Sequence, residues 1–339
     1  MNRKERMKLI KKIEEQEKCK LIIYIAGDRR GMETKIATDI FPLFHQHLTK
    51  IGAQNKIDLF IYSTGGETIA GYGLVNLIRE FCEKFNVIIP FKAYSCATLI
   101  SLGANEILMT KMAQISPIDP SVSHPLGPAV EIPGQPGSKR IAPVSVEDVN
   151  AYVDLAKKEI GLKAEESMTK VFEILSANVN PLVLGAVQRS REQIAFLSKT
   201  LLKQHSKDDK NIENIVKTLT RERFSHNYLI GKKEAKDVLN LNIVEPKKEL
   251  DNNIIALYNE YKKMTQLDIP YNPEVFLGQN TTKTGDFNRG IIESHNLTHL
   301  FRTKKEVKRV TVQQKGMPIP VMGHQERILQ QEWIEDNSI

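Results

Sequence analysis

Long hydrophobic runs are missing from this chain of 339 residues. Its longest apolar stretches, such as residues 21 to 26 and 87 to 91, are far shorter than the roughly 20 residues that a membrane-spanning helix needs. The first 18 residues mix charges of both signs and contain no apolar centre, which predicts an amphipathic helix and not a secretion signal. We therefore expect a cytoplasmic protein with no membrane partner.

Cysteine and tryptophan are also scarce. The three cysteines, Cys19, Cys82 and Cys96, have no metal-ligand spacing and cannot all pair, so we expect neither a disulfide nor a metal site. The net charge is only +7, and one short basic run lies at residues 302 to 310. A nucleic-acid interface needs a concentrated basic face with aromatic stacking residues, so we expect no nucleic-acid partner.

A regular alternation of strand-like and helix-like segments fills the first third of the chain. Buried strands are predicted at residues 19–28, 56–63 and 86–95, with helical patterns at 32–52 and 67–85. Strands that alternate with helices are joined by crossover connections, which produce a parallel sheet covered on both sides. The sequence therefore predicts an α/β fold with a mainly parallel sheet.

The composition changes after residue 120. Five prolines between residues 121 and 145 predict a loop, and helical patterns follow, among them a long amphipathic segment at 180–205. Residues 231–244 predict a short helix that returns to the sheet. Beyond about residue 265 the chain is polar and irregular, with residues 302–313 alternating like an edge strand. We expect an extension over residues 261–339 with a few short strands or disorder.

Two strand ends carry unusual residues, and ligands of open α/β sheets bind at the carboxyl ends of parallel strands. Gly65 and Gly66 follow the strand at 56–63 and precede a helical segment. Paired glycines allow backbone N–H groups to face a ligand closely, and the helix adds its positive N-terminal dipole. An anion or an oxyanion is the ligand that this turn favours; a plain tight turn between strand and helix is the alternative.

Ser95 ends the next strand and begins the next helix. One interpretation is an ordinary helix N-cap. The other is a nucleophile whose own helix supplies the N–H of Cys96 as a second oxyanion donor. Because Tyr94 and Cys96 flank the serine, the glycine-flanked motif of α/β-hydrolases is absent, and that fold is not favoured.

Several motifs in order resemble one known family. Over roughly residues 20 to 250 the chain contains "DLFIYSTGG", "SCATLISLGANEILMTK", "SPIDPS" and "FSHNYLIGKKEAKDVLNLNIV". Together they resemble the serine dehydrogenase proteinase family, a signal-peptide-peptidase-like branch of the Clp protease and crotonase superfamily. The resemblance implies a Clp/crotonase-like spiral of βαβ units over residues 1–260. It also implies a serine peptidase without a cofactor, acting on peptides or proteins as a homo-oligomer; whether an ATPase or other partner feeds it stays open.

The resemblance further implies a triad in the order Ser95, Asp119 and His226, with an oxyanion hole formed by the N–H groups of Gly66 and Cys96. A serine hydroxyl needs a base to take its proton, histidine titrates near neutral pH, and an acid orients the imidazole. The alternatives at these places are Gly65 in the oxyanion turn, His124 or one of Lys157 and Lys158 as the base, and Glu222 as the orienting acid.

Plainer roles and other functions also stay open. His226 is otherwise an interior histidine bonded to a carbonyl, and Asp119 before Pro120 is otherwise a turn former. An acyl-CoA enzyme of the crotonase kind would keep the oxyanion hole and leave Ser95 idle. A non-catalytic scaffold would act through its C-terminal extension instead.

Overall fold

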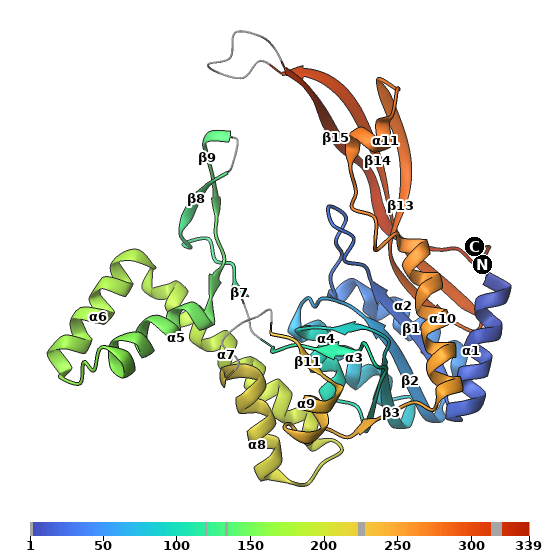
Figure 1. Ribbon diagram of the computed structural model, residues 1–339, viewed down its shortest axis with the longest axis horizontal. Helices are drawn as coiled ribbons and strands as arrows, with labels where there is room; N and C mark the ends of the chain where they lie inside the picture. The colour runs from blue at the N-terminus through green and yellow to red at the C-terminus, as the bar shows by residue number, and fades with distance from the viewer. Residues whose placement is uncertain (1–2, 119–120, 133–134, 223–227, 313–320, 339) are drawn as a thin grey trace. The chain divides into compact units, whose positions relative to one another are not determined.

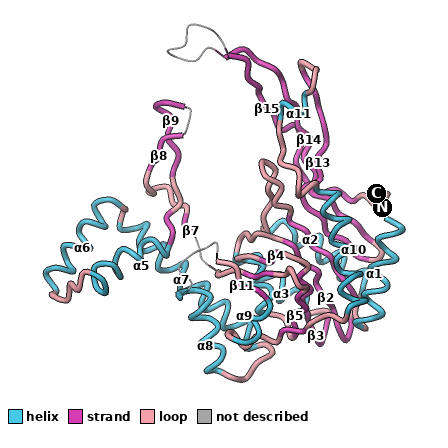
Figure 2. The backbone as a smooth tube through the Cα atoms, in the orientation of Figure 1, coloured by secondary structure: helices cyan, strands magenta, loops and turns pink. Residues whose placement is uncertain are grey.

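The computed structural model describes residues 3–118, 121–132, 135–222, 228–312 and 321–338 (Figures 1 and 2). The chain forms two compact units, one of residues 1–115 with 231–339 and one of residues 116–230. The C-terminal hundred or so residues therefore group with the N-terminal strands. The domain boundary at residue 260, expected from the sequence, stays a prediction.

One eight-stranded sheet forms the centre of the first unit, in the order β12-β5-β3-β2-β1-β13-β14-β15. The strands from β12 to β1 run parallel, and the last three continue the sheet antiparallel. The parallel strands are β1 (Lys20–Ala26), β2 (Gln54–Tyr62), β3 (Cys82–Ile89), β5 (Glu106–Met109) and β12 (Ile243–Val244). This confirms the α/β fold with a mostly parallel sheet.

Helices cover both faces of the sheet because its parallel strands are apolar on both sides. The last six residues of β1 and of β2 are all buried. Helices α2, α3 and α4 cover one face, and α1 packs against α10 on the other (Figure 1). These helices are α1 (Arg3–Glu17), α2 (Phe41–Ile51), α3 (Thr68–Arg79), α4 (Cys96–Leu102) and α10 (Lys248–Thr265); the shorter α9 (Lys232–Asp237) and α11 (Pro273–Leu277) belong to the same unit.

The helix expected at residues 32–52 begins later than predicted. Residues 32–37 are not helical, and a short 3-10 turn, η1 (Thr38–Ile40), precedes α2. The reason is tertiary: the N–H of Ile36 donates to the carbonyl of Gly65 at 3.0 Å, so this backbone pairs with a distant turn. Helical periodicity alone does not reveal such a pairing.

The strand expected at residues 86–95 is two strands. It begins as β3, stops before Pro90, and resumes as β4 (Lys92–Ala93), which pairs in parallel with β6 (Gln114–Ile115). Proline has no N–H to donate to a strand ladder, which explains the break. Because of it, the residues after Pro90 leave β3 and approach the end of β2.

The C-terminal strands are long, where the sequence predicted a few short strands or disorder. They are β13 (Thr282–Ser294), β14 (Leu297–Val312) and β15 (Val321–Glu335). In Figure 1 they extend as a ribbon beyond the rest of the sheet. β14 pairs with β13 on one side and with β15 on the other, so the alternating run that begins at residue 302 is not the edge strand that was predicted. Alternation indicates a strand but not its neighbours.

A buried ion pair fastens α1 and α10 to β13. The Arg6 guanidinium donates to both carboxylate oxygens of Glu293, at 2.9 and 2.8 Å, and the Tyr261 hydroxyl donates to the same carboxylate at 2.5 Å. All three side chains are fully buried. Each charge has its partners, so the pair is stable as built, whereas removing one partner would leave a buried charge unpaired.

Two buried histidines, His47 on α2 and His299 on β14, contact each other. His47 is fully buried, its Nδ1 is 2.7 Å from the hydroxyl of Ser294, and its Nε2 is 3.1 Å from Nδ1 of His299. Burial first, and then the neighbouring His299 and Lys50, lower the pKa of His47 to about 3. The ring is therefore neutral in the folded protein at neutral pH.

We expect this histidine to make folding acid-sensitive. Its pKa is about 3 when folded, against 6.5 unfolded, so the unfolded chain binds the proton first and stability falls as pH drops from about 6.5 towards 3. The slope from this group is at most about 1.4 kcal/mol per pH unit. Denaturant unfolding at a series of pH values measures it. His47→Asn should flatten the profile and His45→Gln, on an exposed position of the same helix, should not; identical profiles for the wild type and His47→Asn would contradict the assignment.

The second unit is mainly helical, with a β-hairpin where the sequence predicted a loop. The hairpin pairs β8 (Ala129–Ile132) with β9 (Gln135–Ile141), and β7 (Ser121–Val122) pairs with β10 (Val144–Ser145). Ser145 caps the following helix, since its hydroxyl accepts the N–H groups of Glu147 and Asp148. The helical segments are α5 (Val146–Asp154), η2 (Leu155–Glu159), α6 (Glu165–Asn178), α7 (Pro181–Lys203), α8 (Asp209–Lys217) and η3 (Thr218–Glu222).

Hydropathy singles out one helix pair in this unit. Within the described ranges, no helix by itself is both long and apolar enough to cross a bilayer. Among the described helices, α6 and α7 taken together meet the criteria of length and composition, and the chain bends by 102° between them.

Candidate active site

The Gly65–Gly66 turn at the end of β2 has a backbone that favours glycine. The φ angles are +116° at Gly65 and +158° at Gly66. The turn is braced from one side by Ser63, whose buried hydroxyl accepts the N–H of Gly65 at 3.0 Å. On its other side Ile36 donates to the carbonyl of Gly65 at 3.0 Å and accepts the N–H of Glu67 at 2.9 Å. The turn is therefore held by neighbours on both sides.

The N–H of Gly66 lies between these two bonds and takes part in neither. In the part of the chain that the structure describes, neither this N–H nor that of Cys96, at the first position of α4, has a hydrogen-bond acceptor. The first N–H groups of a helix have no partner within the helix. Two backbone donors thus remain available at the ends of neighbouring strands.

Ser95 has a strained backbone at the start of α4. Its φ and ψ are 52° and −112°, a conformation that residues other than glycine rarely adopt. It occupies the N-cap position, yet its side chain makes no capping hydrogen bond to the helix, so the plain capping interpretation has no support. Such outliers cost about 1 to 3 kcal/mol and concentrate at functional sites, as in the strand-to-helix turn that exposes a nucleophile.

Ser95 and Gly65 touch. A methyl group at Gly65 would lie 2.8 Å from Cβ and 3.2 Å from Oγ of Ser95, so only glycine fits. Their contact follows from the pairing of the two strand ends: the N–H of Ser63 donates to the carbonyl of Lys92, and the N–H of Tyr94 donates back to Ser63, both at 3.0 Å. The fold thereby brings the serine and the double-glycine turn into one place.

Cys96 serves a structural role beside the serine. Its side chain is fully buried, and its Sγ is 3.0 Å from the carbonyl of Glu67, which links the start of α4 to the start of α3. Burial raises the pKa of this thiol to about 12, so it stays protonated at neutral pH and is no nucleophile. A methyl group at Gly71 would lie only 2.5 Å from this sulfur. The close packing of α3 and α4 therefore positions the N–H of Cys96.

A charged cluster at the same strand ends escaped the sequence analysis. Asp28 follows β1, and its carboxylate accepts the Tyr62 hydroxyl at 2.6 Å and the Lys92 ammonium at 2.7 Å. Asp28 and Lys92 are mostly buried, and burial followed by the charge of Asp28 raises the pKa of Tyr94 to about 12. The one sequence signal was the Gly27–Asp28 pair at the end of a strand; the identity of its partners depends on the sheet order.

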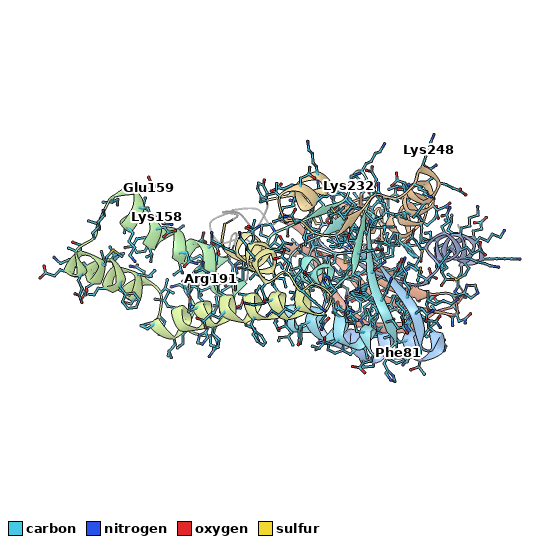
Figure 3. All side chains as sticks on the ribbon, turned by 90° about the horizontal axis from the view of Figure 1, so that it is seen from below. Phe81, Lys158, Glu159, Arg191, Lys232 and Lys248 are labelled. Atoms are coloured by element: carbon cyan, nitrogen blue, oxygen red, sulfur yellow. The ribbon has the colours of Figure 1, made fainter. Side chains whose placement is uncertain are left out.

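The structure places the remaining candidates as follows. Asp119 and His226 lie outside the described residues, and Glu222 ends η3 without a described side chain. His124 accepts the N–H of Leu126 on its Nδ1 at 3.1 Å. Lys158 is on η2, where it is largely exposed and pairs with Asp154 at 2.8 Å (Figure 3). Among the described residues, therefore, the structure brings together Ser95, Gly65, Gly66 and Cys96.

The described residues also contain no group of three histidine, cysteine, aspartate or glutamate side chains that converges as a metal site.

A comparison with known protein families places this chain among serine proteinases. The family described as ClpP-like SDH-type serine proteinase matches residues 1–180. Because this is more than half of the chain, the protein belongs to that family, and the resemblance seen in the sequence is confirmed.

The relatives are similar over limited parts of the chain. One uncharacterized protein of Methanocaldococcus jannaschii is 37% identical over 105 residues, which are 31% of this chain and 34% of that protein. A second from the same organism is 26% identical over 183 residues, 54% of this chain and 51% of that protein. The chain thus spans about a third to about half of the length of these relatives.

Two solved structures represent the structural likeness. A membrane-bound stomatin-specific protease is 15% identical, with a TM-score of 0.38 over 68% of this chain and 83% of that chain. ClpP1 from Listeria monocytogenes is 19% identical, with a TM-score of 0.36 over 71% of this chain and 97% of that chain.

Proposed function

We propose that this chain is a serine peptidase that cleaves peptide bonds through an acyl-enzyme at Ser95. The observation that carries the proposal is the contact between a strained serine and the double-glycine turn, beside two backbone N–H groups that have no acceptor among the described residues. Membership of a serine proteinase family supports the same reaction class. The chemistry is acyl transfer from the peptide to the serine oxygen and then to water.

Each step uses a group of this chain. Oγ of Ser95 attacks the peptide carbonyl carbon while a base takes its proton, and the carbonyl oxygen becomes an oxyanion. The N–H groups of Gly66 and Cys96 donate to that oxyanion, and the strained turn keeps them in place before the substrate arrives. The intermediate then expels the amine, which takes the proton from the base. In the second half of the reaction the base takes a proton from water, and the water oxygen attacks the acyl carbon. Ser95 then leaves and takes the proton back from the base.

We propose His226 as the base and Asp119 as the acid that orients it. Support comes from the sequence, in which the motifs "SPIDPS" and "FSHNYLIGKKEAKDVLNLNIV" of the resembled family contain Asp119 and His226. The rival base Lys158 is less suited. Lys158 is exposed and already ion-paired, and a catalytic lysine needs a buried site that makes it neutral.

The choice of base is testable by substitution. We expect His226→Ala to lower kcat for a p-nitrophenyl ester by about a millionfold and Asp119→Asn by about ten-thousandfold, because a triad acts as a unit. His124→Ala and Lys158→Met are the matched controls and should stay within about twofold of wild type, since neither has a role in the proposed proton transfer. A large loss in either control with full activity in His226→Ala would reassign the base.

The function itself is tested by labelling with a fluorophosphonate probe, followed by mass spectrometry of the modified peptide. We expect one label, on Ser95. Tight acyl-CoA binding by calorimetry in a protein that no probe labels would favour the crotonase-like alternative instead. We further propose a homo-oligomer in the cytoplasm with peptide or protein substrates; light scattering and cell fractionation test these points.

A further inference from the structure

An arginine of β13 holds the segment that braces the oxyanion turn. This segment is residues 32–36, whose last residue pairs with Gly65 and Glu67. Arg289 donates from Nε to the carbonyl of Met32 at 3.0 Å and from Nη2 to the carbonyl of Glu33. The guanidinium therefore contacts the backbone of the bracing segment three residues before the point at which that segment meets the turn.

Arg289 lies at an irregular point of its strand, which directs its side chain towards this contact. The pairing of β13 with β14 shifts register between Asn288 and Gly290, so Arg289 is the extra residue of a β-bulge. Bulges re-aim a side chain and are frequent beside active sites. The third nitrogen of the guanidinium is also engaged, since Nη1 donates to Gln331 at 2.7 Å and to Thr303 at 3.2 Å.

The backbone of Arg289 adds a second link to the same end of the sheet. Its carbonyl accepts the N–H of Gly27 at 2.9 Å, and a methyl group at Gly27 would lie 2.6 Å from that oxygen. Gly27 in turn accepts the N–H of Thr34 at 2.8 Å. The side chain and the backbone carbonyl of Arg289 thus both hold the loop that follows β1 and that pairs with the glycine turn through Ile36.

We propose that Arg289 is a positioning residue for the oxyanion hole: by fixing residues 32–36 it keeps Ile36 paired with the glycine turn and so aims the N–H of Gly66. The inference rests on the proposed function. It assigns a role in the active site to the C-terminal strands, which lie outside the residues that the family matches. The planar, always charged guanidinium suits this role because it binds two carbonyls and two side chains at once.

The expected effect is on the chemical step. A displacement of about 1 Å at a catalytic donor can lower the rate by about a hundredfold even when the substituted residue is remote. We expect Arg289→Met to lower kcat for a p-nitrophenyl ester by about 10- to 100-fold with KM within about twofold, because the donor acts on the oxyanion and not on the ground state. The kcat of Arg289→Lys should lie between those of the wild type and Arg289→Met, since an ammonium can bind fewer of these acceptors.

Arg302→Met is the matched control. Arg302 is a partly buried arginine of the neighbouring strand β14, and it donates to Asn288 and Asp336, both at 3.0 Å, but not to residues 32–36. Its loss should lower stability to a similar extent and leave kcat within about twofold of the wild type. Thermal unfolding of both variants measures the stability part separately.

Hydrogen–deuterium exchange of the full chain tests the mechanical link without relying on activity. The amides of Ile36 and Glu67 are bonded across the brace, so peptides covering residues 32–36 and 61–68 should exchange about tenfold faster in Arg289→Met and unchanged in Arg302→Met. Unchanged exchange in Arg289→Met, or full kcat despite faster exchange, would overturn the inference. A wild type that no probe labels would instead refute the proposed function, and the exchange result would still decide whether Arg289 holds the turn.

Discussion

Replacing Ser95 with alanine is expected to abolish fluorophosphonate labelling and to lower kcat by about a millionfold. The substitution removes only the hydroxyl group, whose oxygen attacks the substrate. The fold should be preserved because Ser95 makes no capping bond to its helix. Alanine also keeps the Cβ that lies against Gly65. Circular dichroism and the melting temperature check that the variant is folded.

Ser101→Ala is the matched control for this experiment. Ser101 is a buried serine of the same helix, and its hydroxyl donates to the carbonyl of Ala97 at 2.8 Å. Its loss should lower stability by about 1 kcal/mol and leave labelling intact. Equal labelling of wild type and Ser95→Ala would show that another residue is the nucleophile and would end the case for an acyl-enzyme at this strand end.

Gly66→Ala is expected to lower kcat by about 100- to 1,000-fold while Ser95 remains in place. The new methyl group would lie 2.1 Å from the carbonyl oxygen and 2.5 Å from the nitrogen of Ile36, so the brace must separate from the turn. The Gly66 N–H then no longer points towards the oxyanion. The loss of one oxyanion donor corresponds to about 3 to 4 kcal/mol of transition-state stabilisation. Steady-state hydrolysis of a p-nitrophenyl ester should show the loss in kcat, with KM little changed.

Gly52→Ala separates backbone strain from this local effect. Gly52 has a φ of +74° and no atom within 4 Å of an added methyl group, so the variant carries the strain of a left-handed residue without a collision. It should melt at a lower temperature and keep kcat within about twofold. If Gly52→Ala loses as much activity as Gly66→Ala, the loss reflects global stability and the glycine turn has no special part in the reaction.

The local pattern of the sequence was sufficient for the fold class and for the two strand ends. Buried strands at residues 19–28 and 56–63 alternate with helices, and this alternation alone predicts parallel crossovers. Gly65, Gly66 and Ser95 were found because glycine pairs and serines at strand ends have local conformational reasons to be there. Their common position also followed, since the carboxyl ends of parallel strands meet at one edge of a sheet.

The boundaries and the support of the site were not predictable in the same way. Residues 32–37 show a helical period but are not helical, because Ile36 pairs with the glycine turn, and the C-terminal strands are neither short nor irregular. The bonds of Asp28 to Tyr62 and Lys92 join residues 34 and 64 positions apart, and the bond of Arg289 to Met32 spans 257 positions. No periodicity reports on such pairs, because each depends on sheet order and on the register of a bulge.

The sequence by itself thus determined the α/β class, the family, and the serine and glycines at the strand ends, since these depend on backbone preferences within a few residues. Only the tertiary structure decided that Ser95 is strained and in contact with Gly65, and that Ile36 and Arg289 hold the turn in place. The physical reason is that strain and positioning arise from hydrogen bonds and packing between distant segments, which exist only after the chain has folded.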